Sequence, residues 1–376
     1  MKIGIYTQPL RTNYGGILQA WALQTVLKRM GHEVVTFDPC PYLHLSWKRL
    51  PFSYTKRFIN NLFGRNKNPI RYEKLKNAEY DTKSQHLRPF IEANIQRKEF
   101  CKVSELQQSD YDILIAGSDQ VWRPKYNKTY GRTIEYAFFD FAEKWNVKRI
   151  AYAASFGTDE WEFTEEQTAQ CARLARLFDA ISVRETSGID LCKVHLGVDA
   201  IRVLDPTMLL NREDYEELIK KGVKTNKPSG NMLCYVLDEN SETETLIEKV
   251  SRTKNLRPFK ANFIKKGAKI KEQIQPPIEQ WLRNFQETDF IVTDSFHACV
   301  FSIIFGKPFV VITNEERGVT RYESLLSMFN LSNHLIRSAS GYQPNFDYAV
   351  TPEARECLND MRNFSIQFLK NALISQ

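Results

Sequence analysis

The stretch MKIGIYTQPLRTNYGGILQAWALQTVLKRMGHEVVTF, residues 1–37, decides the fold. Residues 2–7 and 33–37 are short apolar runs, and each predicts a buried strand. Between them, apolar residues recur at helical spacing from residue 13 to about residue 30, and Gly31 is placed to cap the end of that helix. A strand, a helix and a second strand in this order predict a parallel sheet.

The same alternation continues along the rest of the chain. The first half predicts further strands at residues 111–116, 149–154, 180–183 and 201–204, and a helix at 164–178. The second half predicts strands at 232–237, 256–263, 290–293 and 309–312, and helices at 242–252, 278–286, 296–305, 321–328 and 352–374. We place a domain boundary at Asp205-Pro206, where the pattern breaks. Two such α/β domains would enclose a cleft faced by strand carboxyl ends and helix N-termini.

The composition limits the classes of protein that fit. The chain has 376 residues, 42% hydrophobic and 26% charged, which is ordinary for a globular protein of about two domains. Its 52 basic and 45 acidic residues give a net charge of +7, too small a surplus to indicate nucleic-acid binding. Seven scattered cysteines without a C-x-x-C pair indicate free thiols. With no apolar run long enough for a membrane span and an early polar start, we expect a cytoplasmic protein.

A basic and aromatic stretch interrupts the alternation at residues 47–76. It contains nine Lys or Arg residues against one acid, Glu73, and six interleaved aromatic residues. We expect a mostly helical or irregular excursion from the sheet, within an insert at about residues 44–100. Such a composition suits peripheral contact with an anionic membrane surface. The alternative, slightly favoured, is a solvated insert that packs its aromatic side chains on the sheet.

Four junctions between a predicted strand and a predicted helix carry candidate functional residues. Such junctions offer free backbone N–H groups and the positive end of a helix dipole, and they therefore suit anions. The two glycines of the first junction would let the backbone approach a ligand closely. At each junction a purely structural role is the alternative: a tight turn, a helix cap, an internal ion pair or a core histidine. The four are NYGG (13–16), GSDQVW (117–122), SVRETS (182–187) and TDSFHA (293–298).

The residue types at these junctions indicate chemistry on an anionic small molecule. Asp119 could act as a general base or bind a substrate hydroxyl. Arg184 is expected to face the cleft, where it could pair with a carboxylate or phosphate, and Arg321 could add charge. His297, in the first turn of its helix, can donate and accept protons. The chain has neither a P-loop nor a G-x-G-x-x-G motif, so the residues alone favour a transferase that acts on a phosphate-bearing donor.

Several of these segments resemble the polysaccharide pyruvyl transferase family. The similarity runs in order from residue 1 to about residue 330, and its last block is the most specific. The sequence differs from the usual family pattern at Ala298, where the family has glycine after the histidine. The matching segments are NYGGILQA (13–20), ALQ (22–24), GSDQVW (117–122), SFG (155–157), SVRE (182–185), LDPT (204–207), TDSFH (293–297) and VFSIIFGKPF (300–309).

The resemblance implies a fold and an activity. The expected fold is α/β and GT-B-like, with Rossmann-like domains at residues 1–205 and 206–350 and a C-terminal helix, 351–376, that crosses back to the first domain. The expected activity is transfer of a carboxyethylidene group, as a pyruvate ketal, from phosphoenolpyruvate to a sugar of a bacterial surface polysaccharide or its lipid-linked precursor. Phosphoenolpyruvate would be a co-substrate, with no metal and no other cofactor. The acceptor partner would be a lipid-diphosphate-linked oligosaccharide at the inner face of the membrane.

The chemistry of the expected reaction suggests roles for residues of this sequence, which we state as a hypothesis. Arg184 and His297 would bind the anionic groups of the donor, and His297 is also the candidate general acid. Asp119 is the candidate base for the acceptor hydroxyl. The remaining expected donor-binding residues are Asn13, Gly15, Gly16, Ser118, Ser295 and Arg321.

Two other functions fit the same fold. One is a glycosyltransferase that uses a nucleotide-sugar donor in the same cleft. The other is a carbohydrate-binding protein without catalytic activity. A fold does not decide among them, because function depends on the site.

Overall fold

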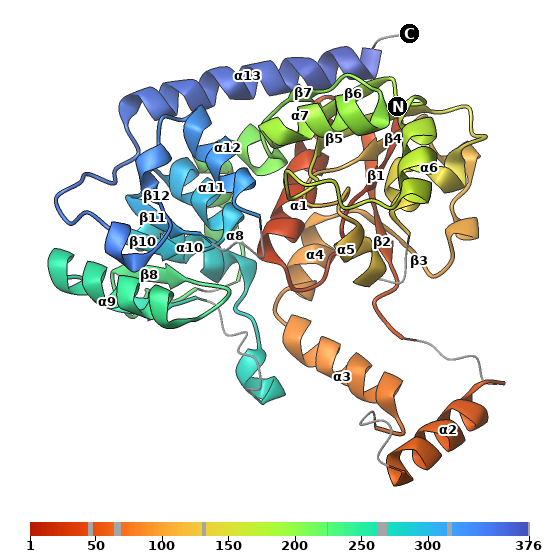
Figure 1. Cartoon of the computed structure of the whole chain (residues 1–376), viewed down its shortest axis with the longest axis horizontal. Helices are drawn as coiled ribbons and strands as arrows, with labels where there is room; N and C mark the ends of the chain where they lie inside the picture. Colours follow the sequence, from red (N-terminus) through yellow and green to blue (C-terminus); the bar gives the residue numbers. More distant parts are fainter. Residues whose placement is uncertain are drawn as a thin grey trace.

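The computed structural model describes residues 1–43, 48–63, 69–129, 133–223, 225–261, 269–313 and 318–374. Within them the chain forms two parallel β-sheets, each surrounded by helices (Figure 1). Among the helices described, none combines the length and the apolar character that a membrane span requires. The expected α/β architecture with two domains is confirmed.

The N-terminal sheet has the strand order β3-β2-β1-β4-β5-β6-β7, with all neighbours parallel. It contains every strand expected in the first half of the chain. The additional edge strand β3 escaped prediction because its sequence RKEF is mostly charged. The strands are β1 (Lys2–Tyr6), β2 (Glu33–Pro39), β3 (Arg97–Phe100), β4 (Ile113–Ala116), β5 (Lys148–Ala154), β6 (Ala180–Val183) and β7 (Ile201–Arg202).

Both faces of this sheet are buried, as an α/β sheet requires. Successive residues of β4 point to opposite faces. Ile113 and Ile115 therefore join one hydrophobic core, whereas Leu114 joins another. The helices of this domain are α1 (Tyr14–Arg29), α2 (Leu50–Leu62), α3 (Tyr72–Ser84), α4 (Arg88–Asn94), α5 (Pro124–Thr129), α6 (Glu165–Ala175) and α7 (Thr186–Leu191).

The C-terminal sheet has the order β12-β11-β10-β8-β9, again with parallel neighbours. Helix α8 was not predicted, because it is strongly polar and Tyr215 is its one buried residue. The end of the strand expected at 256–263 lies outside the described residues. The elements are α8 (Arg212–Lys221), β8 (Met232–Tyr235), α9 (Ser241–Lys254), β9 (Pro258–Lys260), α10 (Ile278–Glu287), β10 (Phe290–Thr293), α11 (Phe296–Phe305), β11 (Phe309–Ile312), α12 (Thr320–Met328) and β12 (Leu335–Ile336).

Helix α13 (Pro352–Ile374) runs along both domains (Figure 1). Its first turns touch the C-terminal domain, where the Cys357 thiol lies 3.2 Å from the carbonyl oxygen of Met328. Its later turns pack on the N-terminal domain, where the Leu204 backbone N–H donates to the Ser365 hydroxyl over 3.0 Å. The expected crossing helix is therefore present.

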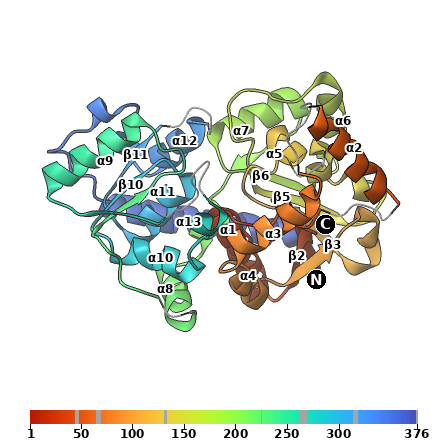
Figure 2. The same ribbon diagram turned by 90° about the horizontal axis from the view of Figure 1, so that it is seen from below.

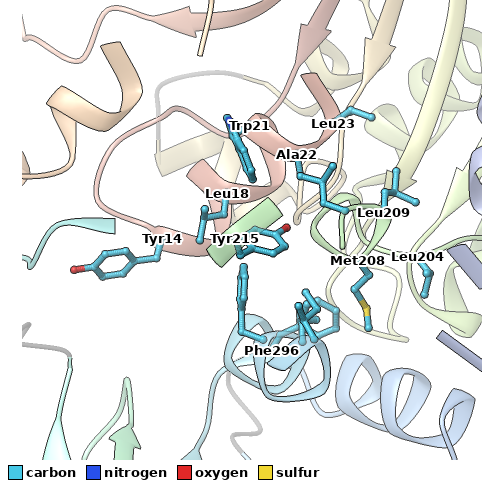
Figure 3. Close-up of a cluster of buried hydrophobic side chains, with 14 of the residues drawn as sticks. Tyr14, Leu18, Trp21, Ala22, Leu23, Leu204, Met208, Leu209, Tyr215 and Phe296 are labelled. Carbon is cyan, nitrogen blue, oxygen red and sulfur yellow. The ribbon is translucent and has the colours of Figure 1, made fainter. Parts of the chain in front are cut away.

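Helix α1 forms the other main link between the domains. The ring of Trp21 packs edge-on against Tyr215 of α8, with centroids 5.6 Å apart. Tyr14 stacks on Trp281 of α10 at 5.1 Å, with the rings nearly parallel. Figure 3 shows side chains of α1 facing Tyr215 and the start of α11 within one buried cluster. The beginning of α1 is thus held in place at the domain interface.

The excursion expected at 47–76 is helical where it is described and projects from the N-terminal domain (Figure 1). Seen from below, α2 and α3 lie in front of that domain (Figure 2). Residues 44–47 and 64–68, with Trp47 among them, lie outside the described residues. Helix α2 has no buried residue, and Phe52 and Phe58 are 73% and 55% exposed. The favoured expectation that these aromatic side chains pack on the sheet is therefore wrong.

Candidate active site

A cavity of about 280 Å³ lies between the two domains. It is bordered by loops that follow β1, β4, β8 and β10, since the carboxyl ends of parallel strands gather at one edge of each sheet. Its walls combine amide, hydroxyl, charged and aromatic side chains. The lining residues are Gln8, Pro9, Thr12, Asn13, Tyr14, Gly15, Gly16, Asp119, Gln120, Tyr126, Tyr235, Leu237, Gln275, Trp281, Ser295, Phe296, His297, Arg321 and Tyr322.

Most of the residues predicted for the site meet in this cavity. The junctions at 13–16, 117–122 and 293–298 come from three strands of two sheets, yet all three supply lining residues. Arg321, from the first turn of α12, lines the same space. Ala298 is fully buried in the core behind the cavity.

The starts of α1 and α11 approach each other closely at Gly15. A Cβ added to Gly15 would lie 2.0 Å from Nδ1 of His297, so a side chain there would displace the imidazole. Neither Asn13 nor Ser295, the residues that precede these two helices, caps its helix with a side-chain hydrogen bond in the described chain. Two helix N-termini, with their positive dipole ends, therefore converge on one cavity.

Asp119 is held in an unusual backbone conformation beside the cavity. Its φ of 68° lies in the left-handed region, which aspartate tolerates better than most residues. One carboxylate oxygen accepts from Nδ2 of Asn13 at 3.3 Å, and the other accepts from the backbone N–H of Gln120 at 2.9 Å. Asp119 is not a helix cap, because the next helix, α5, begins at Pro124.

Asp205 is the central acidic residue of the site, and the sequence analysis missed it. Its side chain is almost fully buried, and Oδ2 accepts from Ser118 Oγ at 3.0 Å and from Arg184 Nη1 at 2.9 Å. Oδ1 accepts from the backbone N–H and the hydroxyl of Thr207. His297 Nε2 lies 3.8 Å from Oδ2. Ser118, expected to bind the donor, instead lies fully buried beneath the cavity.

Arg184 is placed differently from the prediction. Its side chain is 3% exposed and does not face the cavity within the described structure. The guanidinium lies 4.2 Å from the ring centroid of Phe296, and its Nη2 is 3.8 Å from the Asp119 carboxylate, and both of these residues line the cavity. The internal ion pair weighed as the alternative is present, with Asp205 as the partner. Glu185 instead accepts the backbone N–H groups of residues 156 and 157.

Burial and charge set the protonation states in the unliganded site. Burial raises the pKa of Asp205, but the adjacent His297 and Arg184 outweigh it, so the net pKa is lowered and the carboxylate is ionised. Burial lowers the pKa of His297, and this exceeds the opposing effect of Asp205 and Asp119. The imidazole is therefore neutral at pH 7, between charged neighbours.

Aromatic side chains form a wall of the cavity that sequence reasoning did not assign to the site. Tyr14 donates from its hydroxyl to the carbonyl oxygen of Pro276 at 2.7 Å while its ring stacks on Trp281. Tyr126 and Tyr235 line the same space. The NYGG segment was the one signal for Tyr14, whereas Trp281 belongs to α10, whose apolar spacing indicates only a core helix.

No metal site is assigned. Among the described residues, no three His, Cys, Asp or Glu side chains are grouped so as to hold a metal ion. No disulfide bond joins any of the seven cysteines, all of which lie in the described residues.

The fold and the site define a two-domain α/β protein with an interdomain cavity suited to an anionic ligand. Residues 13–316 match the polysaccharide pyruvyl transferase family, and the chain belongs to that family. The match begins at the Asn13 junction and continues past the His297 junction, so it includes both halves of the cavity. Membership indicates pyruvyl transfer as the class of reaction.

Solved structures are similar to the chain at low sequence identity. Arabidopsis thaliana UGT89C1 complexed with UDP-L-rhamnose is 10% identical with a TM-score of 0.48, covering 99% of this chain and 97% of that one. Sucrose-phosphate synthase from Thermosynechococcus elongatus is 9% identical with a TM-score of 0.49, covering 100% and 98%. UDP-N-acetylglucosamine 2-epimerase from Rickettsia bellii is 8% identical with a TM-score of 0.49, covering 99% and 96%. No curated protein sequence matches the chain.

Proposed function

We propose that the protein transfers a carboxyethylidene group from phosphoenolpyruvate to two hydroxyls of a sugar, and so forms a pyruvate ketal on a bacterial surface polysaccharide or its lipid-linked precursor. One observation carries the proposal. Junctions that belong to the family match converge on one cavity, where two helix N-termini and Arg321 surround His297 and Asp119.

The donor in this proposal is bound by positive groups of the cavity. Phosphoenolpyruvate carries a carboxylate and a phosphate. Arg321 lines the cavity and can pair with either group. The N–H groups at the starts of α1 and α11 can donate hydrogen bonds to the other anionic group, because helix N-termini are natural anion sites. Arg184, whose Nη2 lies 3.8 Å from Asp119 Oδ1, adds its charge to the positive field of the site.

His297 supplies the first proton. The imidazole is neutral before the donor binds. An anion beside it favours the imidazolium form, because an opposite charge raises the pKa of a histidine. Binding of the donor therefore favours protonation of His297, the residue that then acts as the general acid. Transfer of that proton to the methylene carbon of phosphoenolpyruvate forms a methyl group and makes C2 electrophilic.

Asp119 accepts the proton of the attacking hydroxyl. The first sugar oxygen forms a bond to C2 as its proton moves to the Asp119 carboxylate. The bond between C2 and the phosphate oxygen then breaks, and phosphate leaves with the bonding electrons. The second hydroxyl attacks C2 and its proton passes to the departed phosphate, which closes the ketal. Asn13 and the backbone of Gln120 hold the carboxylate in place for the first step.

Asp205 acts as a positioning residue. It holds Arg184 through a 2.9 Å ion pair and lies near His297 Nε2. Its negative charge favours the protonated form of His297, and so works in the same direction as the donor. Ser118 and Thr207 satisfy the remaining positions on its oxygens.

Thermal unfolding with candidate donors tests the proposal. Ligand at 100 times its Kd stabilises the folded state by about 2.7 kcal/mol. We expect phosphoenolpyruvate to raise the Tm of the wild type, and nucleotide sugars in parallel samples to leave it unchanged. The rise should disappear in His297→Gln and in Arg321→Met. His86→Gln, at an exposed position on another part of the chain, is the control that keeps the rise.

Two results would contradict the proposal. A rise with a nucleotide sugar alone would indicate a glycosyltransferase. If the protein unfolds cooperatively and neither class of donor raises its Tm, phosphoenolpyruvate does not bind the enzyme in the absence of acceptor, which contradicts the proposal.

A further inference from the structure

The positive charge of the chain is concentrated in one segment. Of 52 basic and 45 acidic residues, nine basic and one acidic lie at residues 47–76, which leaves 43 basic and 44 acidic residues elsewhere. The rest of the protein is therefore close to neutral. The segment includes α2 and the beginning of α3, which project from the N-terminal domain (Figure 1).

Helix α2 has two different faces. Toward α3, the Arg57 guanidinium makes two hydrogen bonds to the Glu73 carboxylate, of 2.7 and 2.5 Å, and lies over the ring of Tyr72. The outward face is apolar. Phe52 and Ile59 are seven residues apart and so lie on one side of the helix, with Phe58 and Leu62 beside them.

The outward apolar side chains are strongly exposed. Phe52 is 73% exposed, Phe58 55%, Ile59 46% and Leu62 71%. Four large apolar side chains that are exposed on one helix mark an interaction surface. Exposed basic side chains accompany it: Lys56 lies one turn from Phe52 on the same helix, and Lys74 is exposed near the start of α3. An amphipathic helix with aromatic residues on one face and lysine or arginine beside them is typical of helices that lie in a membrane interface.

Charge distinguishes the two kinds of partner that could cover this face. A second copy of the chain on the same face would bring two strongly basic segments together, which is unfavourable. An anionic bilayer offers both hydrocarbon for the phenylalanine side chains and headgroups of opposite charge. The charge balance therefore favours the bilayer.

We propose that the outward face of α2, namely Phe52, Phe58, Ile59 and Leu62 with the basic residues around it, docks on an anionic lipid bilayer. The far end of this excursion reaches the candidate active site. The Lys83 carbonyl oxygen, near the end of α3, accepts from the backbone N–H of Gln275 at 3.4 Å, and Gln275 lines the cavity. Docking through α2 would hold the cavity beside the membrane.

The reason for docking rests on the proposed function, because docking would bring the enzyme to an acceptor in the membrane. A sugar acceptor attached to a lipid diphosphate remains in the bilayer. An enzyme held at the same surface would meet it by diffusion in two dimensions. The docking itself involves neither donor nor acceptor, so it can be tested apart from catalysis.

Co-sedimentation of the purified full chain with vesicles tests the proposal. We expect binding to phosphatidylcholine vesicles that contain phosphatidylglycerol, weaker binding to pure phosphatidylcholine, and a decrease as salt is added. Phe52→Ser with Leu62→Ser should weaken binding at least about tenfold, because each change removes a large apolar side chain from the bilayer. Lys56→Glu with Lys74→Glu should weaken binding to the anionic vesicles by about fivefold or more. Binding to pure phosphatidylcholine should not change.

Each double variant has a matched control elsewhere on the surface. Val194 and Phe364 are 71% and 49% exposed, and their change to serine removes apolar surface far from α2 in the sequence. Lys193→Glu with Lys227→Glu changes the net charge by the same amount at two other exposed sites. Both controls should bind anionic vesicles like the wild type.

Three results would overturn the docking proposal. They are the absence of binding to anionic vesicles at low salt, an equal loss of binding in the controls, and a dimer in solution that Phe52→Ser with Leu62→Ser converts to a monomer without any vesicle binding. The rise in Tm with phosphoenolpyruvate reports on the proposed function separately. It should be the same in the α2 variants and in the wild type.

Discussion

Asp205 shows how one buried side chain organises the site. Its carboxylate contacts groups from three other strand ends: Ser118 after β4, Arg184 after β6 and His297 after β10. A buried charge is stable only when it is paired and hydrogen-bonded, and here each oxygen has at least two partners. The residue therefore brings together groups from both domains at the base of the cavity.

Asp205→Asn should destabilise the protein and stop turnover. The change leaves the Arg184 guanidinium buried without its main counter-charge, which costs about 3–5 kcal/mol. Urea unfolding measures the loss. Asp81→Asn breaks an exposed pair with Arg88 and should cost at most about 1 kcal/mol. Equal losses in the two variants would mean that Asp205 has no special role in stability.

Residue identity alone predicted much of the site. The junctions at Asn13, Asp119 and His297 were predicted to be functional, and all three residues line the cavity. Asp205 was not predicted, because an aspartate before a proline indicates a turn. Its partners are 87, 21 and 92 positions away in the chain, and no local pattern shows such contacts.

At the scale of elements, a histidine beside the C-terminal sheet should make stability depend on pH. His334 precedes β12 and packs on the rings of Phe309 and Tyr348. Burial lowers its pKa to about 4, despite a hydrogen bond with the Phe309 backbone and the charge of Asp347. The unfolded chain therefore binds a proton near pH 6.5, whereas the folded chain does not until about pH 4.

The free energy of unfolding should thus fall as the pH is lowered from 7 to 5. This one group contributes about 2 kcal/mol of the fall, because the unfolded state gains the proton first. In His334→Phe the same change of pH should cost about 2 kcal/mol less than in the wild type. Urea unfolding of both proteins at the two pH values checks this. Identical pH dependence would show that His334 titrates alike in both states.

The elements themselves were mostly predictable from apolar spacing. Helix α11 and strand β10 have the predicted bounds, since both are continuous apolar runs with clear ends. Helix α8 and strand β3 were missed, because their sequences are polar and tertiary contacts stabilise them. Tyr215 of α8, packed against Trp21 and Phe301, provides such contacts.

At the scale of the whole molecule, α13 joins the two domains into one cooperative unit. Leu358 and Leu369 are both buried in the core that the domains share, eleven residues apart on the helix. The same helix donates from Arg362 to the carbonyl oxygen of Met208 in the segment between the sheets. Its packing therefore fixes how the domains face each other.

Leu369→Ala should lower the free energy of unfolding by about 2–5 kcal/mol, because it leaves a cavity in the shared core. Phe364→Ala, on the exposed side of the same helix, should change it by less than about 0.5 kcal/mol. Urea unfolding followed by fluorescence gives both values. We expect a single transition in the wild type and in Phe364→Ala, and separate transitions for the domains in the wild type would contradict a shared core.

The sequence by itself determined the two α/β domains, the order of most of their elements, the family and three of the junctions that form the cavity. These features follow from local periodicity and from short motifs. Only the tertiary structure decided that Asp205 pairs with Arg184, that Tyr14 and Trp281 line the cavity, and that the apolar face of α2 points to solvent. Each of these depends on side chains from distant segments meeting, or failing to meet, in space. Burial and charge pairing act over distances of a few ångströms in the folded chain, whatever the separation in sequence.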